Sequence, residues 1–146
     1  MTGTILVAVN DSSAAFAAAQ VAIEYAKRWD SRLCVVTVIE DGELGARFDS
    51  IATADARRES AAEAVLTHVA ALGVSAGVIV EKRKRAGRVA AAILEEARAV
   101  NASLIVMATV DKPGHIIPSL GSHTLRVLEF ATVPVLVIPN PPIPPH

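Results

Sequence analysis

The stretch Thr4–Val9, TILVAV, is apolar at nearly every position, and Arg32–Val38 (RLCVVTV) and Ser103–Ala108 (SLIVMA) share this pattern. A strand with one face in water alternates apolar and polar residues, whereas a strand buried on both faces is continuously apolar. Val, Ile and Thr are frequent in these stretches, which favours strands over helical segments. The three stretches therefore predict the centre of a parallel sheet that helices cover on both sides.

Outward from this centre, further strands and helices alternate along the chain. Strands are expected at Ala76–Lys82 (AGVIVEK), which runs out into the charged residues Glu81–Arg85 as an edge strand does, and at Val133–Ile138 (VPVLVI). Apolar residues at three- and four-residue spacing predict helices at Ser13–Trp29, Ile51–Leu72, Arg88–Val100 and from Gly121-Ser122 onward. This alternation predicts an α/β fold, a three-layer doubly wound, Rossmann-like sandwich with a five-stranded parallel sheet in the order 3-2-1-4-5 and four helices.

Length and composition limit the class of protein. A chain of 146 residues with 52% hydrophobic and 20% charged residues fits one domain with a packed core and excludes global disorder. A net charge of -1 and five scattered aromatic residues argue against a nucleic-acid partner. The first ten residues lack Lys and Arg and hold a short apolar run, which predicts neither a signal peptide nor a membrane partner. We therefore expect a cytoplasmic protein.

Two segments fall outside the periodic pattern. Residues 39–50 (IEDGELGARFDS) are expected to form a surface loop or a lid. Pro139–His146 (PNPPIPPH) holds five prolines, so the last strand cannot extend far into it. The domain is therefore predicted at residues 1–139, followed by a Pro-rich tail at 140–146 that is either a polyproline ligand or a frayed terminus.

The inventory of reactive side chains is thin. Cys34 is the single cysteine and lies in an apolar run, which predicts a buried, inert thiol. The four histidines fall on separate elements, and neither an HxxxH, a CxxC nor a GxSxG pattern occurs. The acids and lysine of a phospho-receiver domain and the glycine loop and aromatics of a flavodoxin are also missing. The sequence thus predicts no metal site, no catalytic residues and no enzyme.

A ligand site is expected beyond the carboxyl ends of the strands, at the switch point of the doubly wound sheet. Asn10-Asp11-Ser12-Ser13 follows the first strand, where Asp11 and Ser12 either contact a ligand or cap the first helix. Gly121-Ser122 opens the fourth helix and is either an anion site or a plain N-cap. The basic run Lys82–Arg85 is either the solvated end of an edge strand or an electropositive mouth for a small anionic ligand.

Five segments together carry a family resemblance. They are ILVAVNDS (5–12), RLCVVTVIE (32–40), the Gly87 turn with AAAILEEA (90–97), ASLIVMAT (102–109) and LGSHTLRVLEFATVPVLVIP (120–139). Over nearly its whole length the chain resembles the universal stress proteins. This resemblance implies a stress-response or regulatory protein without catalytic machinery, which commonly dimerises through its fifth strand.

Family members that bind ATP carry a Gly-x2-Gly-x9-Gly-(Ser/Thr) motif, and the chain matches its spacing but only part of its chemistry. Ala108 and Asp111 stand where the first two glycines belong, and Asn10 replaces the aspartate after the first strand. The resemblance implies that an adenine nucleotide (ATP, AMP or cyclic AMP) is the ligand, if there is one. The positions that match, and that line the adenosine and phosphate pocket in such relatives, are Val38, Met107, Gly121, Ser122 and Thr124.

The departures from the motif lower the expected affinity. A carboxylate at Asp111 about 6 Å from a phosphate costs on the order of 2–3 kcal/mol at an effective dielectric near 20. Ala108 adds a methyl group and, with a positive φ, a further ~1–2 kcal/mol. Lys112 and His115 offset part of this, and Asn10 still offers a donor and an acceptor to an adenine or ribose edge. We expect ATP binding to be weak or absent; the alternative is a nucleotide switch with an altered phosphate loop.

The fifth strand is expected to form a homodimer. It is short, apolar and last in the sheet, so an edge position would expose it to pairing with a second copy. Val133, Val135 and Val137 are the expected interface residues, and Pro134 and Pro139 limit the ladder at both ends.

Overall fold

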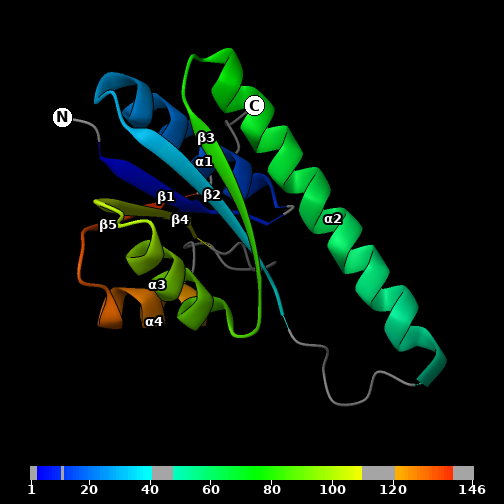
Figure 1. Ribbon diagram of the computed structural model, residues 1–146. Helices are drawn as coiled ribbons and strands as arrows, with labels where there is room; N and C mark the ends of the chain where they lie inside the picture. Colours follow the sequence, from blue (N-terminus) through cyan, green and yellow to red (C-terminus); the bar gives the residue numbers. More distant parts are fainter. Residues whose placement is uncertain (1–2, 11, 41–47, 110–120, 140–146) are drawn as a thin grey trace, which may run out of the picture.

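The computed structural model describes residues 3–10, 12–40, 48–109 and 121–139. Its sheet has five parallel strands in the order β3-β2-β1-β4-β5, which confirms the predicted fold class (Figure 1). The strands are β1 (Thr4–Ala8), β2 (Arg32–Ile39), β3 (Val80–Ala86), β4 (Leu104–Ala108) and β5 (Val135–Ile138). The fully buried strands β1, β2 and β4 lie where continuous apolarity predicted them.

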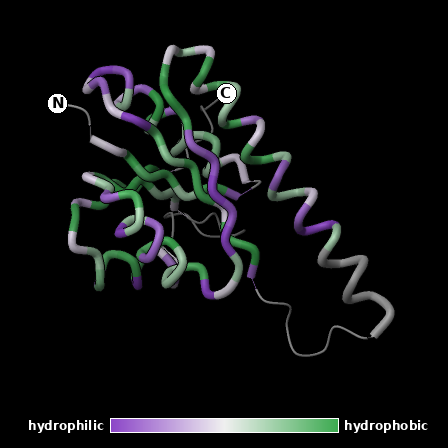
Figure 2. The backbone as a smooth tube through the Cα atoms, in the orientation of Figure 1, coloured by the Kyte–Doolittle hydropathy of each residue, from purple (hydrophilic) through white to green (hydrophobic). Residues whose placement is uncertain are grey.

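Helices cover both faces of the sheet. α1 (Ser13–Arg28) and α2 (Phe48–Ser75) pack on one face, and α3 (Val89–Ala99) and α4 (Ser122–Phe130) lie together on the other (Figure 1). Side chains alternate between the layers: Ile5 and Val7 join the core under α1 and α2, whereas Leu6 joins the core under α3 and α4. The sheet thus has two apolar cores, and the hydropathy colouring shows β3 as a polar strand beside them (Figure 2).

Three helices end in the same backbone motif. After each comes a residue with positive φ: Asp30 (51°) after α1, Gly77 (82°) after α2 and Asn101 (52°) after α3. The next N–H then donates to a carbonyl five residues back, from Ser31 to Ala26 (2.8 Å), from Val78 to Gly73 (2.9 Å) and from Ala102 to Ala97 (2.8 Å). These bonds satisfy carbonyls at the helix end and turn the chain toward the next strand.

The predicted position of the third strand, Ala76–Lys82, is wrong by four residues. Ala76 and Gly77 belong to the turn after α2, and the strand begins only at Val80. The charged run Glu81–Arg85 is therefore the body of the strand and not its solvated end. Its position at the edge of the sheet is as predicted.

Helix α2 is longer than the predicted Ile51–Leu72, because it begins at Phe48 and ends at Ser75. Its buried face is formed by Ala62, Val65, Leu66 and Val69, whereas Ala61 and Ala64 are exposed. Residues 41–47 of the predicted loop lie outside the described residues, as do residues 140–146 of the tail. No helix in the described ranges is long and apolar enough to cross a membrane.

Candidate functional site

The carboxyl ends of β1 and β4, beyond which the sequence predicts a ligand site, are neighbours in the sheet. The side-chain oxygen of Asn10 accepts a hydrogen bond from the Ser12 N–H (3.0 Å), and the Ser12 hydroxyl accepts one from the Ala15 N–H (3.1 Å). Ser12 is thus the N-cap of α1, as one of the two interpretations held. Asp11 lies outside the described residues.

The end of β4 presents Met107, Ala108 and Thr109. Met107 is buried, and Ala108 is half-buried and pairs with Ile138 of β5. Within the described chain, positive φ angles outside glycine occur at Asp30 and Asn101, so Ala108 does not carry the backbone strain that a positive φ would add. Asp111, like Lys112 and His115, belongs to residues 110–120 and lies outside the described residues.

The start of α4 is the third part of the predicted ligand site, beside the ends of β1 and β4. Gly121 is its N-cap with φ 79° and ψ 155°, a conformation that favours glycine, and the helix begins at Ser122 as predicted. As a glycine, Gly121 has no side chain of its own with which to cap α4. Ser122 is exposed, whereas Thr124 is 2% exposed and lies on the inner face of the helix. Backbone N–H groups of a first helical turn attract anions, so this end of α4 suits a phosphate.

The sequence did not predict a contact between His123 and Glu40. His123 Nε2 in the first turn of α4 lies 3.3 Å from Glu40 Oε1, which directly follows β2, and both side chains are more than half exposed. This contact shows that α4 begins at the carboxyl end of the sheet. Val38, near the end of β2, and Met107 share the core under α3 and α4. The carboxyl end of the sheet therefore has an apolar surface from Val38 and Met107 and a carboxylate, Glu40, beside the start of α4.

The basic run on β3 is held by glutamates on both faces. Toward α2, Lys84 Nζ lies 2.6 Å from Glu59 and 3.6 Å from Glu63, and Lys82 Nζ lies 3.7 Å from Glu63. The hydrogen bond that Lys84 donates to Glu59 raises the pKa of Lys84. Lysines paired in this way give little attraction to a free anion.

The arginines of β3 point to the opposite layer. Arg85 Nε lies 2.6 Å from Glu96 Oε1, and Arg83 Nε lies 3.2 Å from Glu96 Oε2 without the alignment of a hydrogen bond. Arg85 also reaches Glu95 (3.1 Å), and Arg83 reaches Glu81 (3.3 Å). Four cations thus face five carboxylates (Glu59, Glu63, Glu81, Glu95 and Glu96), so this surface does not form the electropositive mouth that the sequence analysis considered.

The nearby thiol is inert, as predicted. Cys34 is fully buried in β2, and burial, with the adjacent charge of Glu96, raises its pKa to about 12. A thiol at that pKa holds its proton at neutral pH and is a poor nucleophile. Within the described ranges, no group of three His, Cys, Asp or Glu side chains is arranged to hold a metal ion.

The sandwich and its strand order define a Rossmann-like α/β protein, a fold class in which ligands lie beyond the carboxyl ends of the strands. The chain belongs to the universal stress protein family, whose sequence profile matches residues 1–139. A universal stress family protein from Burkholderia pseudomallei is 32% identical, with a TM-score of 0.75 over 94% of this chain and 96% of that one. No curated protein matches the chain.

Two similar solved structures contain nucleotides. A universal stress protein from Archaeoglobus fulgidus in complex with dAMP is 23% identical, with a TM-score of 0.71 over 93% of this chain and 97% of that one. A universal stress protein in complex with cAMP is 22% identical, with a TM-score of 0.68 over 95% of this chain and 98% of that one. At these identities the likeness shows the fold.

Proposed function

We propose that the chain is a non-catalytic stress-response or regulatory protein that acts as a homodimer and binds ATP weakly or not at all. The arrangement at the carboxyl end of the sheet supports the expectation of weak ATP binding. At the carboxyl end of the sheet Val38 and Met107 offer an apolar surface, but Asn10 is engaged by Ser12 and Glu40 lies beside the first turn of α4. With Asp111 in place of a motif glycine, the phosphate side of the site is unfavourable for a triphosphate.

A second candidate function is an adenine-nucleotide switch. The start of α4 favours it, because Gly121 holds its positive φ and the backbone N–H groups of a first helical turn attract anions. Relatives with the same fold were solved with dAMP and cAMP, which carry a single phosphate. A monophosphate would meet less of the repulsion from Asp111 and Glu40 than a triphosphate does.

Calorimetric titration with ATP, AMP and cyclic AMP tests both candidates. We expect a dissociation constant for ATP above about 100 μM, equivalent to less than about 5.5 kcal/mol of binding free energy. The variant Ala108→Gly with Asp111→Gly should bind ATP at least about tenfold more tightly, and Ala108→Gly alone should change little, because Ala108 carries no positive φ. Tight ATP binding by the unaltered chain would reject the first candidate in favour of the second.

The absence of catalysis is tested separately. Incubation with ATP and Mg²⁺ should yield neither ADP, AMP nor a phosphorylated chain above the rate without protein. A turnover that depends on the protein would overturn the non-catalytic half of the proposal.

The proposed dimer interface is the open edge of β5. The carbonyl groups of Pro134 and Ile138 accept hydrogen bonds from Ile105 and Thr109 on the β4 side. Alternate residues of a parallel strand bond to the same neighbour, so Val135 and Val137 turn their N–H and C=O groups to the open edge. An antiparallel copy would satisfy those groups, and Pro139 would end the ladder.

A further inference from the structure

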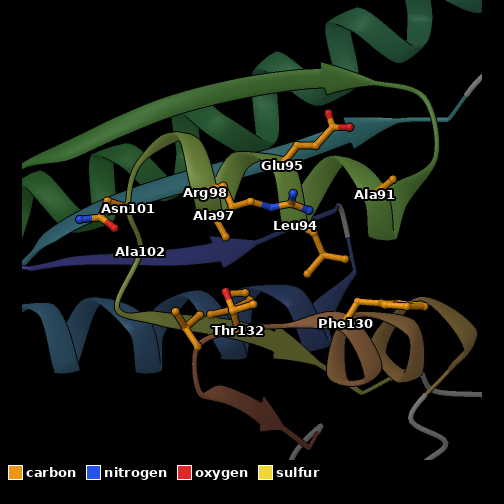
Figure 3. A pocket seen from close by; sticks show the side chains of 11 residues that line it. Ala91, Leu94, Glu95, Ala97, Arg98, Asn101, Ala102, Phe130 and Thr132 are labelled. Carbon is orange, nitrogen blue, oxygen red and sulfur yellow. The ribbon is translucent and has the colours of Figure 1, made fainter.

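A groove runs along α3 on the side that faces α4 and the start of β5 (Figure 3). Its volume is about 510 Å³. Leu94, Ile105, Phe130 and Val133 give it apolar walls, and Phe130 is 57% exposed. It lies apart from the nucleotide crevice, because Thr132 and Val133 precede β5 and mark its amino end.

Three polar side chains of the groove can donate hydrogen bonds. Arg98, Asn101 and Thr132 line it and carry N–H or O–H groups, and the side-chain oxygens of Asn101 and Thr132 also accept. Glu95 also lines it, but its carboxylate is occupied by Arg85 (3.1 Å). Arg98 makes no ion pair with any other residue that the structure describes. The groove therefore fits an apolar ligand that is rich in acceptors and poor in donors.

The tail Asn140–His146 (NPPIPPH) has this chemistry. Four of its seven residues are prolines, which have no N–H, and a polyproline II helix leaves all its carbonyl groups free to accept hydrogen bonds. Proline and isoleucine side chains supply the apolar surface, and proline-rich segments commonly dock on aromatic side chains such as Phe130. Binding costs the tail little conformational entropy, because prolines already restrict the backbone dihedral angles of a free chain.

The β5 pairing decides which groove the tail reaches. The antiparallel ladder that uses the open N–H and C=O groups of Val135 and Val137 sets Val135 of one protomer opposite the partner's Val137. In that register the partner's Ile138, the last residue of its β5, falls opposite Pro134, which directly follows the groove residues Thr132 and Val133. Within one chain, in contrast, the groove begins at the amino end of β5, whereas the tail follows Pro139 at the carboxyl end. The tail therefore starts at the end of β5 that lies away from its own groove.

We propose that the Pro-rich tail of each protomer docks into the α3–α4 groove of its partner. This exchange rests on the proposed dimer through β5. The lengths agree. The groove from Ala91 to Asn101, along α3 and the turn after it, spans about 15 Å. Seven residues of polyproline II span about 22 Å, which is enough to enter and follow the groove. Each tail then covers Phe130 of the partner subunit and extends the short four-residue strand contact.

Site-directed cross-linking of full-length chains tests this exchange. Chains with Ile143→Cys and chains with Thr132→Cys are mixed, refolded together and treated with a short bismaleimide; buried Cys34 does not react. We expect the cross-linked pair to contain one chain of each kind. Adding Phe130→Ala to the Thr132→Cys chain should slow its formation about fivefold, the effect of one lost aromatic contact. The matched control is Gln20→Cys, exposed on α1 in the other helix layer, which should not cross-link to Ile143→Cys.

Sedimentation of the unaltered chain separates the two proposals. A dimer that gives no mixed cross-link, or one that links to Gln20→Cys equally well, overturns tail docking and leaves the β5 dimer intact. A monomer overturns both. A third variant carries both Ile143→Cys and Thr132→Cys in one chain. If the two cysteines of one chain cross-link to each other equally fast at low and at high protein concentration, the tail occupies its own groove. That result also overturns the exchange.

Discussion

β3 and β5 are the two edge strands of one parallel sheet, and they differ in nearly every side chain. β3 carries five consecutive charged residues, Glu81–Arg85, and glutamates from both helix layers pair with its four basic side chains. β5 reads VLVI, and its four side chains are only half-buried in the single chain. A charged edge discourages pairing with another strand, whereas a short apolar edge invites it. The comparison indicates that the sheet is closed to partners at one edge and open at the other.

Placing a charge on the apolar edge should have the largest effect. Val137→Lys introduces two like charges across the proposed two-fold interface, so the dissociation constant of the dimer should rise at least about 100-fold while the monomer stays folded. Sedimentation velocity at tens of micromolar and circular dichroism measure the two quantities.

Ala86→Lys is the matched control, because Ala86 is exposed on the other edge strand and its substitution should leave the dimer unchanged. A dimer that survives Val137→Lys, or one that Ala86→Lys dissociates, would show that the interface lies elsewhere.

Neutralising Glu96, which pairs with two arginines of β3, should lower the stability of the folded chain. Glu96 is 2% exposed and is the carboxylate that Arg83 and Arg85 share, so Glu96→Gln leaves both guanidinium groups without their buried partner. The free energy of unfolding should fall by about 2 kcal/mol, measured by urea denaturation. Glu95→Gln is the control, since its side chain is 62% exposed and the loss should stay within about 0.5 kcal/mol. Equal losses in the two variants would contradict the role of the buried carboxylate.

The smallest effect concerns the thiol beside the charged edge. Burial raises the pKa of Cys34 from 9.0 to about 12, so the folded chain holds this proton more tightly than the unfolded chain does. Its contribution to stability is complete below pH 9 and is lost as the pH rises toward 12, by about 1 kcal/mol for each pH unit.

The stability of Cys34→Ala should fall less steeply over this range than that of the unaltered chain, because only the thiol differs between them. Urea denaturation from pH 8.5 to 10.5 measures both slopes. Parallel slopes for the two proteins would contradict the assigned cause.

The sequence predicted those elements whose signal lies within the element itself. β1, β2 and β4 are continuously apolar, and Gly121-Ser122 marks the start of α4, so local pattern located them. β3 was misplaced because its charges are compensated by Glu59, Glu63 and Glu96, and a periodicity of one segment does not reveal partners far along the chain.

The candidate site divides in the same way. The residues at the ends of β1, β4 and the start of α4 follow from topology, since parallel strands bring their carboxyl ends to one edge. The contact of Glu40 with His123 joins the end of β2 to α4, and no spacing rule connects these two positions. The hydrogen bond from Ser12 to Asn10 depends on the loop backbone, which side-chain patterns do not specify.

The shared ending of α1, α2 and α3 limits how many insertions and deletions one end of the sheet tolerates. Residues 29–31, 76–79 and 100–103 join a helix to the next strand through a fixed backbone bond, so one added residue there shifts the strand and exchanges its two faces. In β3 that shift would exchange the lysines with the arginines, and each would face the wrong glutamates. We therefore expect length variation during evolution to be rare in these three turns.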